Sequence, residues 1–417
     1  MDLGSSGIRV ALIDRHGAVP VELAAPYPAP FDHPEGWRSG LISLCAQVPS
    51  PLRERVGAIA VDGTSGTLLL CRPDGSLASD ALGLALPYHR ACPQQAAAAA
   101  ALVGPQAGPV AAASASGSLA RALWLLEAAT EAGEAGPWLL RHQADWLLGW
   151  LLGDWRWGEE GNNLRLGWDP QAQAWLGDIG AQPWSAALPQ LCPAGTPLGR
   201  LGPAAAAALG LSPHCQVVAG STDASAAVLA ADPQPGDGIT VLGTTLALKQ
   251  FSALPLQGPG LSCQRLAGQW MVGGASNAGA GVLRRFYSDA QLAELSRQID
   301  PRRGSGLALR PLPRPGERFP VDDPELEPIL EPRPVSDALY LQALLEGLAA
   351  IERQGWQRLQ ELGAPPIRRV ISLGGGARNP QWRAIRQRLL GVPVLNRPQC
   401  TAAQGMAKLA LSASRLP

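Results

Sequence analysis

Three short turns of glycine and hydroxyl residues are the first candidates for chemistry in this sequence. They occupy residues 4–7 (Gly-Ser-Ser-Gly), 243–245 (Gly-Thr-Thr) and 374–376 (Gly-Gly-Gly), each beside a predicted strand. Glycine lets a ligand approach the backbone closely, and successive N–H groups in such turns form a concavity that binds anions. The turns therefore indicate phosphate binding, although a single turn of this kind is more often only structural. None has the spacing of a P-loop or of a GxGxxG dinucleotide motif.

Aspartates accompany these turns. Asp2 immediately precedes the first turn, where it could hold a hydrated magnesium ion facing phosphate oxygens. Asp223 follows a predicted strand and a Gly-Ser-Thr turn, and capping the next helix is its simplest interpretation. Asp62 follows the apolar run VGAIAV and is interpreted as a turn residue.

Alternating strands and helices must position these groups. Apolar runs bounded by glycine predict strands at residues 8–13, 56–61, 216–219, 239–242, 246–249, 370–373 and 392–395. Apolar residues at helical spacing predict helices at residues 96–103, 118–152, 224–231, 336–362 and 401–412. A further helix is predicted to begin at Asn379-Pro380, because asparagine suits an N-cap and proline suits the first helical position.

A faint internal repeat links the two ends of the pattern. The segment LGSSGIRVAL at Leu3–Leu12 resembles LGTTLALK at Leu242–Lys249, which suggests two similarly folded halves. Residues 311–334 hold eight prolines and are predicted to be irregular, because proline removes backbone donors and restricts its neighbour. The apolar residues Phe319, Val321, Ile329 and Leu330 are expected to anchor this excursion.

Composition limits the kinds of partner. The chain has 417 residues, with 34 Lys+Arg against 34 Asp+Glu, and this balance disfavours nucleic acid and anionic membranes as partners. Seven scattered cysteines without a CxxC pair argue against a disulfide scaffold, and no apolar run approaches the length of a membrane span. We therefore expect a cytoplasmic α/β protein that acts on small molecules.

Six segments, in order along the chain, resemble the FGGY family of carbohydrate kinases within the actin–hexokinase–Hsp70 superfamily. They are DLGSSGIR at Asp2–Arg9, GSTDASAAVLA at Gly220–Ala230, GTTLALK at Gly243–Lys249, GGASNAGAGVLRRF at Gly273–Phe286, SLGGGARNPQW at Ser372–Trp382 and the closing TAAQGMAKLALSA. The resemblance implies two actin-like, ribonuclease-H-like α/β domains, residues 1–235 and 236–417, with the active site in the cleft between them. It also implies ATP and Mg²⁺ as cofactors.

The family resemblance also assigns roles to residues. Asp223 is implied as the base that accepts the proton of a sugar hydroxyl, and Asp2 as the residue that holds Mg²⁺ through water. The segments VDGTSGT at Val61–Thr67, NNLRLGWD at Asn162–Asp169 and PLPRPGERFPV at Pro311–Val321 resemble the cyanobacterial and plant group assigned as D-ribulose kinases. The implied sugar contacts are Asp2, Ser6, Gly7, Ile8, Arg9, Ser65 and Asp223. The implied nucleotide contacts are Ser5, Gly243, Thr244, Thr245, Gly375, Gly376, Asn379 and Trp382.

Several alternatives stay open. Asn379 could be only a helix cap, and Trp382 only a core residue rather than a cover for the purine. The substrate could be D-xylulose or another polyol, or the chain could be a nucleotide-binding regulator of this fold that has lost catalysis. A non-kinase ATPase of the superfamily is a third possibility, which the FGGY-like segments after residue 273 argue against.

The first motif departs from the family pattern. Family members usually carry several apolar residues before its aspartate, whereas only Met1 precedes Asp2 here. Either the natural protein is longer or its first strand is cut. A cut strand is expected to leave Asp2 on a frayed terminus, with the ammonium group close to its carboxylate.

Overall fold

The computed structural model describes residues 1–78, 80–105 and 111–413 and divides into two compact units. Unit 1 comprises Met1–Ala230, Arg265–Gly268 and the closing segment from Thr401; unit 2 comprises Ala231–Gln264 and Gln269–Cys400. The closing helix therefore counts with unit 1, although its sequence lies at the end of the predicted second domain. Within the described ranges, no helix combines the length and the apolarity needed to cross a membrane.

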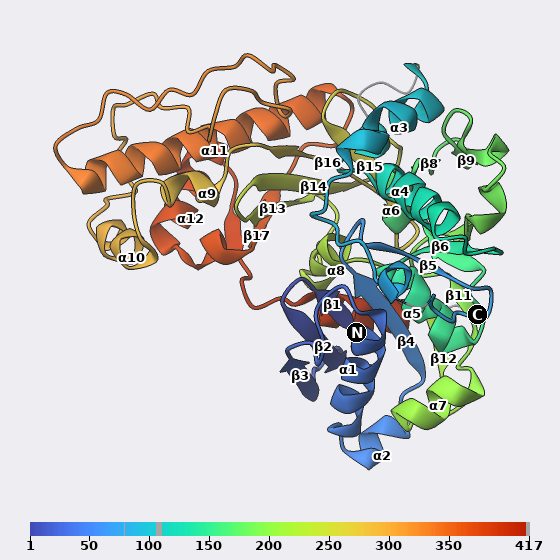
Figure 1. The fold of residues 1–417 in the computed structure, drawn as a ribbon. Coiled ribbons are helices and arrows are strands. Elements are labelled where there is room, and N and C mark those ends of the chain that lie inside the picture. Colours follow the sequence, from blue (N-terminus) through green and yellow to red (C-terminus); the bar gives the residue numbers. More distant parts are fainter. Residues whose placement is uncertain (79, 106–110, 414–417) are drawn as a thin grey trace. The chain divides into compact units, whose positions relative to one another are not determined.

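Unit 1 is built on a six-stranded mixed sheet with the order β11-β12-β4-β1-β2-β3 (Figure 1). Its strands are β1 (Asp2–Gly4), β2 (Gly7–Leu12), β3 (Val21–Ala25), β4 (Ala58–Gly63), β11 (Pro197–Arg200) and β12 (Gln216–Thr222). β1, β2 and β3 form an antiparallel meander, and β4 and β12 run parallel to β1. Asp62, at the end of β4, thus lies beside Asp2 in the register.

The helices of unit 1 are α1 (Pro34–Ala46), α2 (Ser50–Arg53), α3 (Ala96–Val103), α4 (Ser118–Glu131), α5 (Gln143–Leu152), α6 (Glu160–Asn163), α7 (Pro203–Leu209), α8 (Asp223–Ala230) and α13 (Ala402–Ala413). Short strands complete it: β5 (Leu68–Cys71), β6 (Leu139–His142), β7 (Trp157–Glu159), β8 (Trp168–Asp169), β9 (Ala174–Trp175) and β10 (Gln190–Cys192). α5 and α13 both pack against the central strand β4, and α13 packs along α8.

The second sheet has the order β15-β16-β14-β13-β17-β18. Its strands are β13 (Asp237–Leu242), β14 (Leu246–Ser252), β15 (Leu261–Leu266), β16 (Gln269–Ser276), β17 (Arg369–Leu373) and β18 (Val394–Asn396). The helices of unit 2 are α9 (Ala280–Leu283), α10 (Asp289–Arg297), α11 (Asp337–Glu361) and α12 (Pro380–Leu390). α11 supplies much of the core, including the fully buried Leu341, Leu344 and Leu348.

Five strands of each sheet share one topology. In each, a central strand (β1 or β13) is followed on one side by two antiparallel neighbours (β2 and β3, or β14 and β16) and has two parallel strands on its other side. The sixth strand, β11 or β15, lies at opposite edges of this common set. The central hairpin carries the Leu-Gly turn in both cases, at residues 3–7 and 242–246. The expectation of two similarly folded halves is confirmed.

Three expectations need correction. Residues 118–152 are not one helical region, because β6 separates α4 from α5 and pairs with β5. Asp2 is not frayed: its side chain is buried, and β1 is held between β2 and β4. In the proline-rich excursion Phe319 is buried and Leu330 packs on the core, but Val321 and Ile329 are exposed.

Candidate active site

Three aspartates meet at one edge of the sheet of unit 1. Asp2 on β1 and Asp62 on β4 are register partners, and Asp62 is also the partner of Ser221, two residues before Asp223. The arrangement follows from topology, since parallel strands bring their carboxyl ends to the same edge of a sheet. A carboxylate cluster at this edge can bind a cation or accept a proton.

Asp2 is fixed by its neighbour across the hairpin. Arg9 Nη1 donates to Asp2 Oδ2 at 3.0 Å, and these two residues are register partners in β1 and β2. The turn between the strands leaves Ser5 and Ser6 exposed, whereas Gly7 is buried; a Cβ on Gly7 would lie 2.5 Å from the carbonyl oxygen of Ala25. Glycine is therefore required at position 7 by close packing.

Ile8 is a core residue. The whole residue is buried, backbone included, and it is the register partner of Leu3 in β1 and of Ala25 in β3. In this structure Ile8 has no exposed surface for the sugar contact that the resemblance implies, whereas Ser6 and Arg9 do.

Asp223 begins α8 directly after β12 and is half-buried. Its Oδ1 accepts a hydrogen bond from the Ala224 N–H at 2.7 Å. Burial, together with the negative charge of Asp2, raises the pKa of Asp223 to about 6. A carboxylate with a pKa near the operating pH suits a general base.

Asp62 is the residue that sequence reasoning missed. It is completely buried, and burial together with the charge of Asp2 raises the pKa of Asp62 well above its ordinary value. Its carboxyl group interacts with that of Asp2, and neither oxygen accepts a hydrogen bond from another described donor. The sequence did offer one signal. Asp62 directly follows the apolar run that forms a buried parallel strand, whereas an aspartate in a turn is more commonly exposed.

The loop after β4 carries Ser65, which is half-buried. Gln143, the first residue of α5, holds this loop: its Oε1 accepts from Thr64 N at 3.0 Å and from Thr64 Oγ1 at 2.9 Å. The Tyr27 hydroxyl interacts with the Gln143 side chain and donates to the Gly4 carbonyl at 2.7 Å. Gln143 thus connects the Ser65 loop to the first turn.

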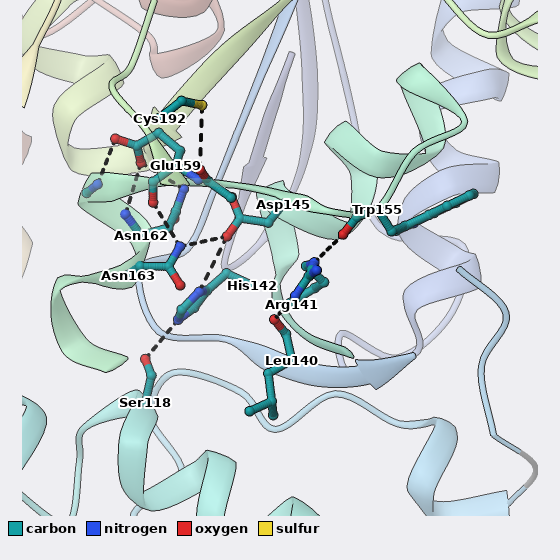
Figure 2. Close-up of polar contacts among 12 residues, drawn as sticks. Ser118, Leu140, Arg141, His142, Asp145, Trp155, Glu159, Asn162, Asn163 and Cys192 are labelled. Atoms are coloured by element: carbon teal, nitrogen blue, oxygen red, sulfur yellow. Dashed lines mark hydrogen bonds and ion pairs between the residues drawn. The ribbon is translucent and has the colours of Figure 1, made fainter. Parts of the chain in front are cut away.

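A buried polar cluster anchors the start of α5 (Figure 2). His142 Nε2 lies 3.0 Å from Ser118 Oγ, and Asp145 Oδ2 accepts from Asn163 Nδ2 at 3.0 Å. Asp145 Oδ1 accepts from Glu159 N at 2.9 Å, and the Glu159 carboxylate caps α6. Burial raises the pKa of Glu159 to about 8, against its hydrogen bonds with Gly161 and Asn162. These contacts join the start of α5 to α4, β7 and α6, although His142 Nδ1, Asn162 Oδ1 and Asn163 Oδ1 have no hydrogen-bond partner among the described residues. We interpret the cluster as the support that positions Gln143.

Unit 2 presents the second turn. Thr244 and Thr245 are exposed, and the turn is held from behind because Ala280 N donates to the Gly243 carbonyl at 2.9 Å and Gly281 N to the Thr244 carbonyl at 3.1 Å. A Cβ on Gly279 would lie 2.4 Å from the Thr244 oxygen. These contacts fix the backbone of the turn, while the hydroxyl groups of Thr244 and Thr245 stay exposed.

The third turn borders a cavity of about 400 Å³ in unit 2. Gly375, Gly376, Asn379 and Trp382, which the resemblance implies as nucleotide contacts, all line it. The other walls come from α9, α10 and α11. Its volume lies within the range of small-molecule sites, and its mixed apolar and polar lining is typical of them.

Two of these residues also serve the fold. Asn379 caps α12, since its Oδ1 accepts from Trp382 N at 3.0 Å, and its Nδ2 donates to Ser296 Oγ at 2.8 Å. Trp382 is only 2% exposed, and a Cβ on Gly376 would meet its ring at 2.4 Å. Trp382 therefore packs as a core side chain beneath the third turn while it borders the cavity.

The carboxylate cluster fits a hydrated cation. Among the described residues, no group of three or more His, Cys, Asp or Glu side chains is arranged to hold a metal directly. Mg²⁺ usually keeps several waters and needs only one or two carboxylates. The buried oxygens of Asp62 beside Asp2 supply hard acceptors of the kind that Mg²⁺ prefers.

Comparison with known proteins gives a family match for residues 238–414 and the fold of the whole chain. Residues 238–414 match the model of the C-terminal domain of the FGGY family of carbohydrate kinases. A xyloylose kinase from Brucella ovis is similar over 100% of this chain and 90% of its own, with 22% identity and a TM-score of 0.83. A xylulose kinase from Rhodospirillum rubrum has the same coverage and identity with a TM-score of 0.81. A glycerol kinase from Plasmodium falciparum with ADP covers 99% and 88%, at 14% identity and 0.80.

These similarities settle the fold class. Residues 238–414 match this family model, and the whole chain has the two-domain, actin-like α/β fold that the sequence predicts.

Proposed function

We propose that this protein is an ATP-dependent carbohydrate kinase that phosphorylates a free ketopentose, with D-ribulose as the preferred substrate and D-ribulose 5-phosphate as the product. The observation that carries the proposal is Asp223, a half-buried carboxylate of raised pKa at the sheet edge where Asp2 and Asp62 also lie. The FGGY match of residues 238–414 supports the kinase reaction, and the VDGTSGT loop at Val61–Thr67 supports ribulose.

In the proposed reaction, Asp223 accepts the proton of the sugar hydroxyl as that oxygen bonds to the γ-phosphorus of ATP. The bond from the γ-phosphorus to the bridging oxygen breaks, and ADP leaves. Phosphoryl transfer depends mainly on alignment and on neutralisation of oxygen charge. Ser6, Arg9 and Ser65 are the proposed side-chain contacts of the sugar.

We propose nucleotide contacts within each unit taken by itself. Ser5 in unit 1 and Gly243, Thr244 and Thr245 in unit 2 would contact phosphate oxygens through N–H and hydroxyl donors. The cavity lined by Gly375, Gly376, Asn379 and Trp382 would take the adenosine. Asp2 would hold Mg²⁺ through water, and the ion would supply neutralisation of phosphate charge.

The test is ADP release measured over D-ribulose, D-xylulose, ribitol, glycerol and water alone. We expect low ATP hydrolysis without sugar and a large rise with D-ribulose, because only a bound acceptor presents a hydroxyl to Asp223. Unchanged turnover across a wide range of ribulose concentrations contradicts the proposed substrate.

D-Xylulose is the second candidate. The structural similarity to xylulose kinases over the whole chain favours it, although that similarity carries the fold rather than the substrate. We rank ribulose first because the VDGTSGT loop at Val61–Thr67 resembles that of the group assigned as D-ribulose kinases. A higher kcat/KM for xylulose than for ribulose in the same panel would reverse the order.

A further inference from the structure

The proline-rich excursion of unit 2 buries a carboxylate that the proposed reaction does not use. Glu317 is 5% exposed, and its backbone pairs with that of Asp323 in both directions. Phe319, two residues later, is also buried, and a Cβ on Gly274 of β16 would meet its ring at 2.4 Å. The excursion therefore packs tightly on β16 at this point.

The carboxylate of Glu317 accepts three hydrogen bonds. Ser276 Oγ, at the end of β16, donates to Oε2 at 2.5 Å, and Asn277 N donates to Oε1 at 2.7 Å. Arg318 N donates to Oε1 at 2.9 Å. Hydrogen bonds to an ionised acceptor are about twice as strong as neutral ones, so Glu317 holds the chain firmly where it leaves β16.

The residues after Asn277 contact the second turn from behind. Ser276 Oγ accepts from Ala278 N at 2.9 Å, and the Ala278 carbonyl accepts from Leu246 N at 2.7 Å, directly after the turn at residues 243–245. Ser276 Oγ thus connects the carboxylate of Glu317 to the backbone beside the turn.

The amides of residues 280 and 281 complete this connection. They donate to the Gly243 and Thr244 carbonyls at 2.9 and 3.1 Å. The fit is close as well, because a Cβ on Gly281 would lie 2.7 Å from Thr244 Cγ2. A shift of residues 276–281 must therefore shift the turn.

We infer that Glu317 is a positioning residue for the second turn: through residues 276–281, it fixes the backbone that Gly243, Thr244 and Thr245 present to the nucleotide phosphates. The identity of this ligand rests on the proposed function, whereas the support of the turn is a property of unit 2 alone. Donors fixed before the ligand arrives need no reorganisation when charge develops on the phosphate oxygens.

The test uses Glu317→Ala in the full chain. Loss of both acceptor oxygens should speed exchange of the Ala280 and Gly281 amides by about tenfold or more. We expect the Kd for MgATP to rise by about tenfold, because the turn is assigned to its phosphates. The Kd for adenosine should stay within about twofold, because adenosine is assigned to the cavity beside the third turn.

Two further variants separate positioning from general stability. Glu317→Gln keeps an acceptor for Asn277 N and gains an amide donor for Ser276 Oγ, so it should recover most of the affinity for MgATP. Asp237→Ala is the matched control, since Asp237 is a buried carboxylate at the start of β13 that accepts from Arg369 Nε at 2.8 Å. It should lower Tm and leave the Kd for MgATP unchanged.

Unchanged exchange of the Ala280 and Gly281 amides in Glu317→Ala overturns the inference, whatever happens to nucleotide affinity. An equal loss of affinity for MgATP and for adenosine also overturns it, as does a loss for MgATP that Asp237→Ala shares, because Glu317 would then only stabilise unit 2. If the unsubstituted chain binds no MgATP, the proposed function fails, and amide exchange alone decides whether Glu317 holds the turn.

Discussion

At the scale of single residues, Asp223 combines two roles that one substitution can separate. It begins α8, where its Oδ1 accepts from Ala224 N, and it is the proposed base. Asp223→Asn keeps an acceptor oxygen for the helix but cannot take a proton. We expect sugar phosphorylation to fall by about 10²–10⁴-fold while nucleotide binding stays within about twofold.

Steady-state kinetics and nucleotide titration check this prediction. Asp322→Asn, at an exposed position in unit 2, is the matched control and should leave turnover unchanged. Full activity of Asp223→Asn would remove this residue as the base.

The raised pKa of Asp223 gives a second prediction. Burial and the charge of Asp2 favour its protonated form, so its pKa is about 6, and only the ionised carboxylate can act as base. We expect kcat/KM for the sugar to be constant above about pH 7 and to fall by about tenfold per pH unit well below pH 6. The measurement is a pH profile at saturating ATP. An unchanged rate down to pH 5 would contradict the assignment; Asp62, which also faces this group, would then be tested in the same way.

At the scale of elements, Gln143 ties the start of α5 to the loop after β4. Gln143→Leu removes the acceptor of Thr64 N and Oγ1 and leaves a buried N–H unpaired, at a cost of about 1–3 kcal/mol. Because Ser65 follows Thr64, we expect the KM for the sugar to rise about tenfold, with the KM for ATP within about twofold. If Gln143 had only a structural role, the substitution would lower Tm without raising the KM for the sugar more than the KM for ATP. Gln94→Leu, at an exposed position, is the control.

The core of unit 2 depends on a buried ion pair that joins two helices to the sheet. Arg386 on α12 donates to Glu352 on α11 at 2.5 and 2.7 Å, both side chains are fully buried, and Thr240 Oγ1 also donates to Glu352 at 2.6 Å. Arg386→Met leaves the buried carboxylate of Glu352 without its cation, and we expect a loss of about 3–5 kcal/mol in the free energy of unfolding. Denaturant titration measures it.

Arg358→Met is the matched control for that prediction. Arg358 pairs with Glu361 on the exposed side of α11, at 3.2 Å. Exposed pairs contribute about 0–1 kcal/mol to stability. Equal losses in the two variants would mean that the buried pair contributes no more than an exposed one.

Elements were predictable from sequence where local signals agreed. The cap Asn379 followed by Pro380 fixed the start of α12, and Ser336 caps α11 as expected. The prediction of one helical region at residues 118–152 was wrong. The apolar content there suits both a helix and the short strand β6, and only the pairing of β6 with β5 decides between them. Asp62 was missed for a related reason: its burial depends on β1 and β12, which lie far from it in sequence.

At the scale of the whole molecule, the repeated Leu-Gly turn predicted the topology that five strands of each sheet share, because the same hairpin stands at the centre of both sheets. The sequence could not show that the closing helix belongs with unit 1. That assignment rests on packing between α13 and α8, which are about 180 residues apart and carry no shared local signal.

Gly405 makes this packing possible. A Cβ there would lie 1.8 Å from the Ala226 carbonyl oxygen of α8, so the two helices touch through backbone. Gly405→Val must push α8 away, and α8 begins with Asp223. Overpacking costs about 1–3 kcal/mol or more, so we expect a lower Tm and a fall in kcat that exceeds any change in nucleotide binding.

Gly57→Ala is the control for that variant, because a Cβ at Gly57 meets no atom within 4 Å. Thermal unfolding and turnover should both stay near those of the unsubstituted chain. If Gly405→Val lowered Tm but left kcat unchanged, α13 would support the fold of unit 1 without setting the position of Asp223. The end of the chain would then have no part in the proposed chemistry, and the base would be placed by β12 alone.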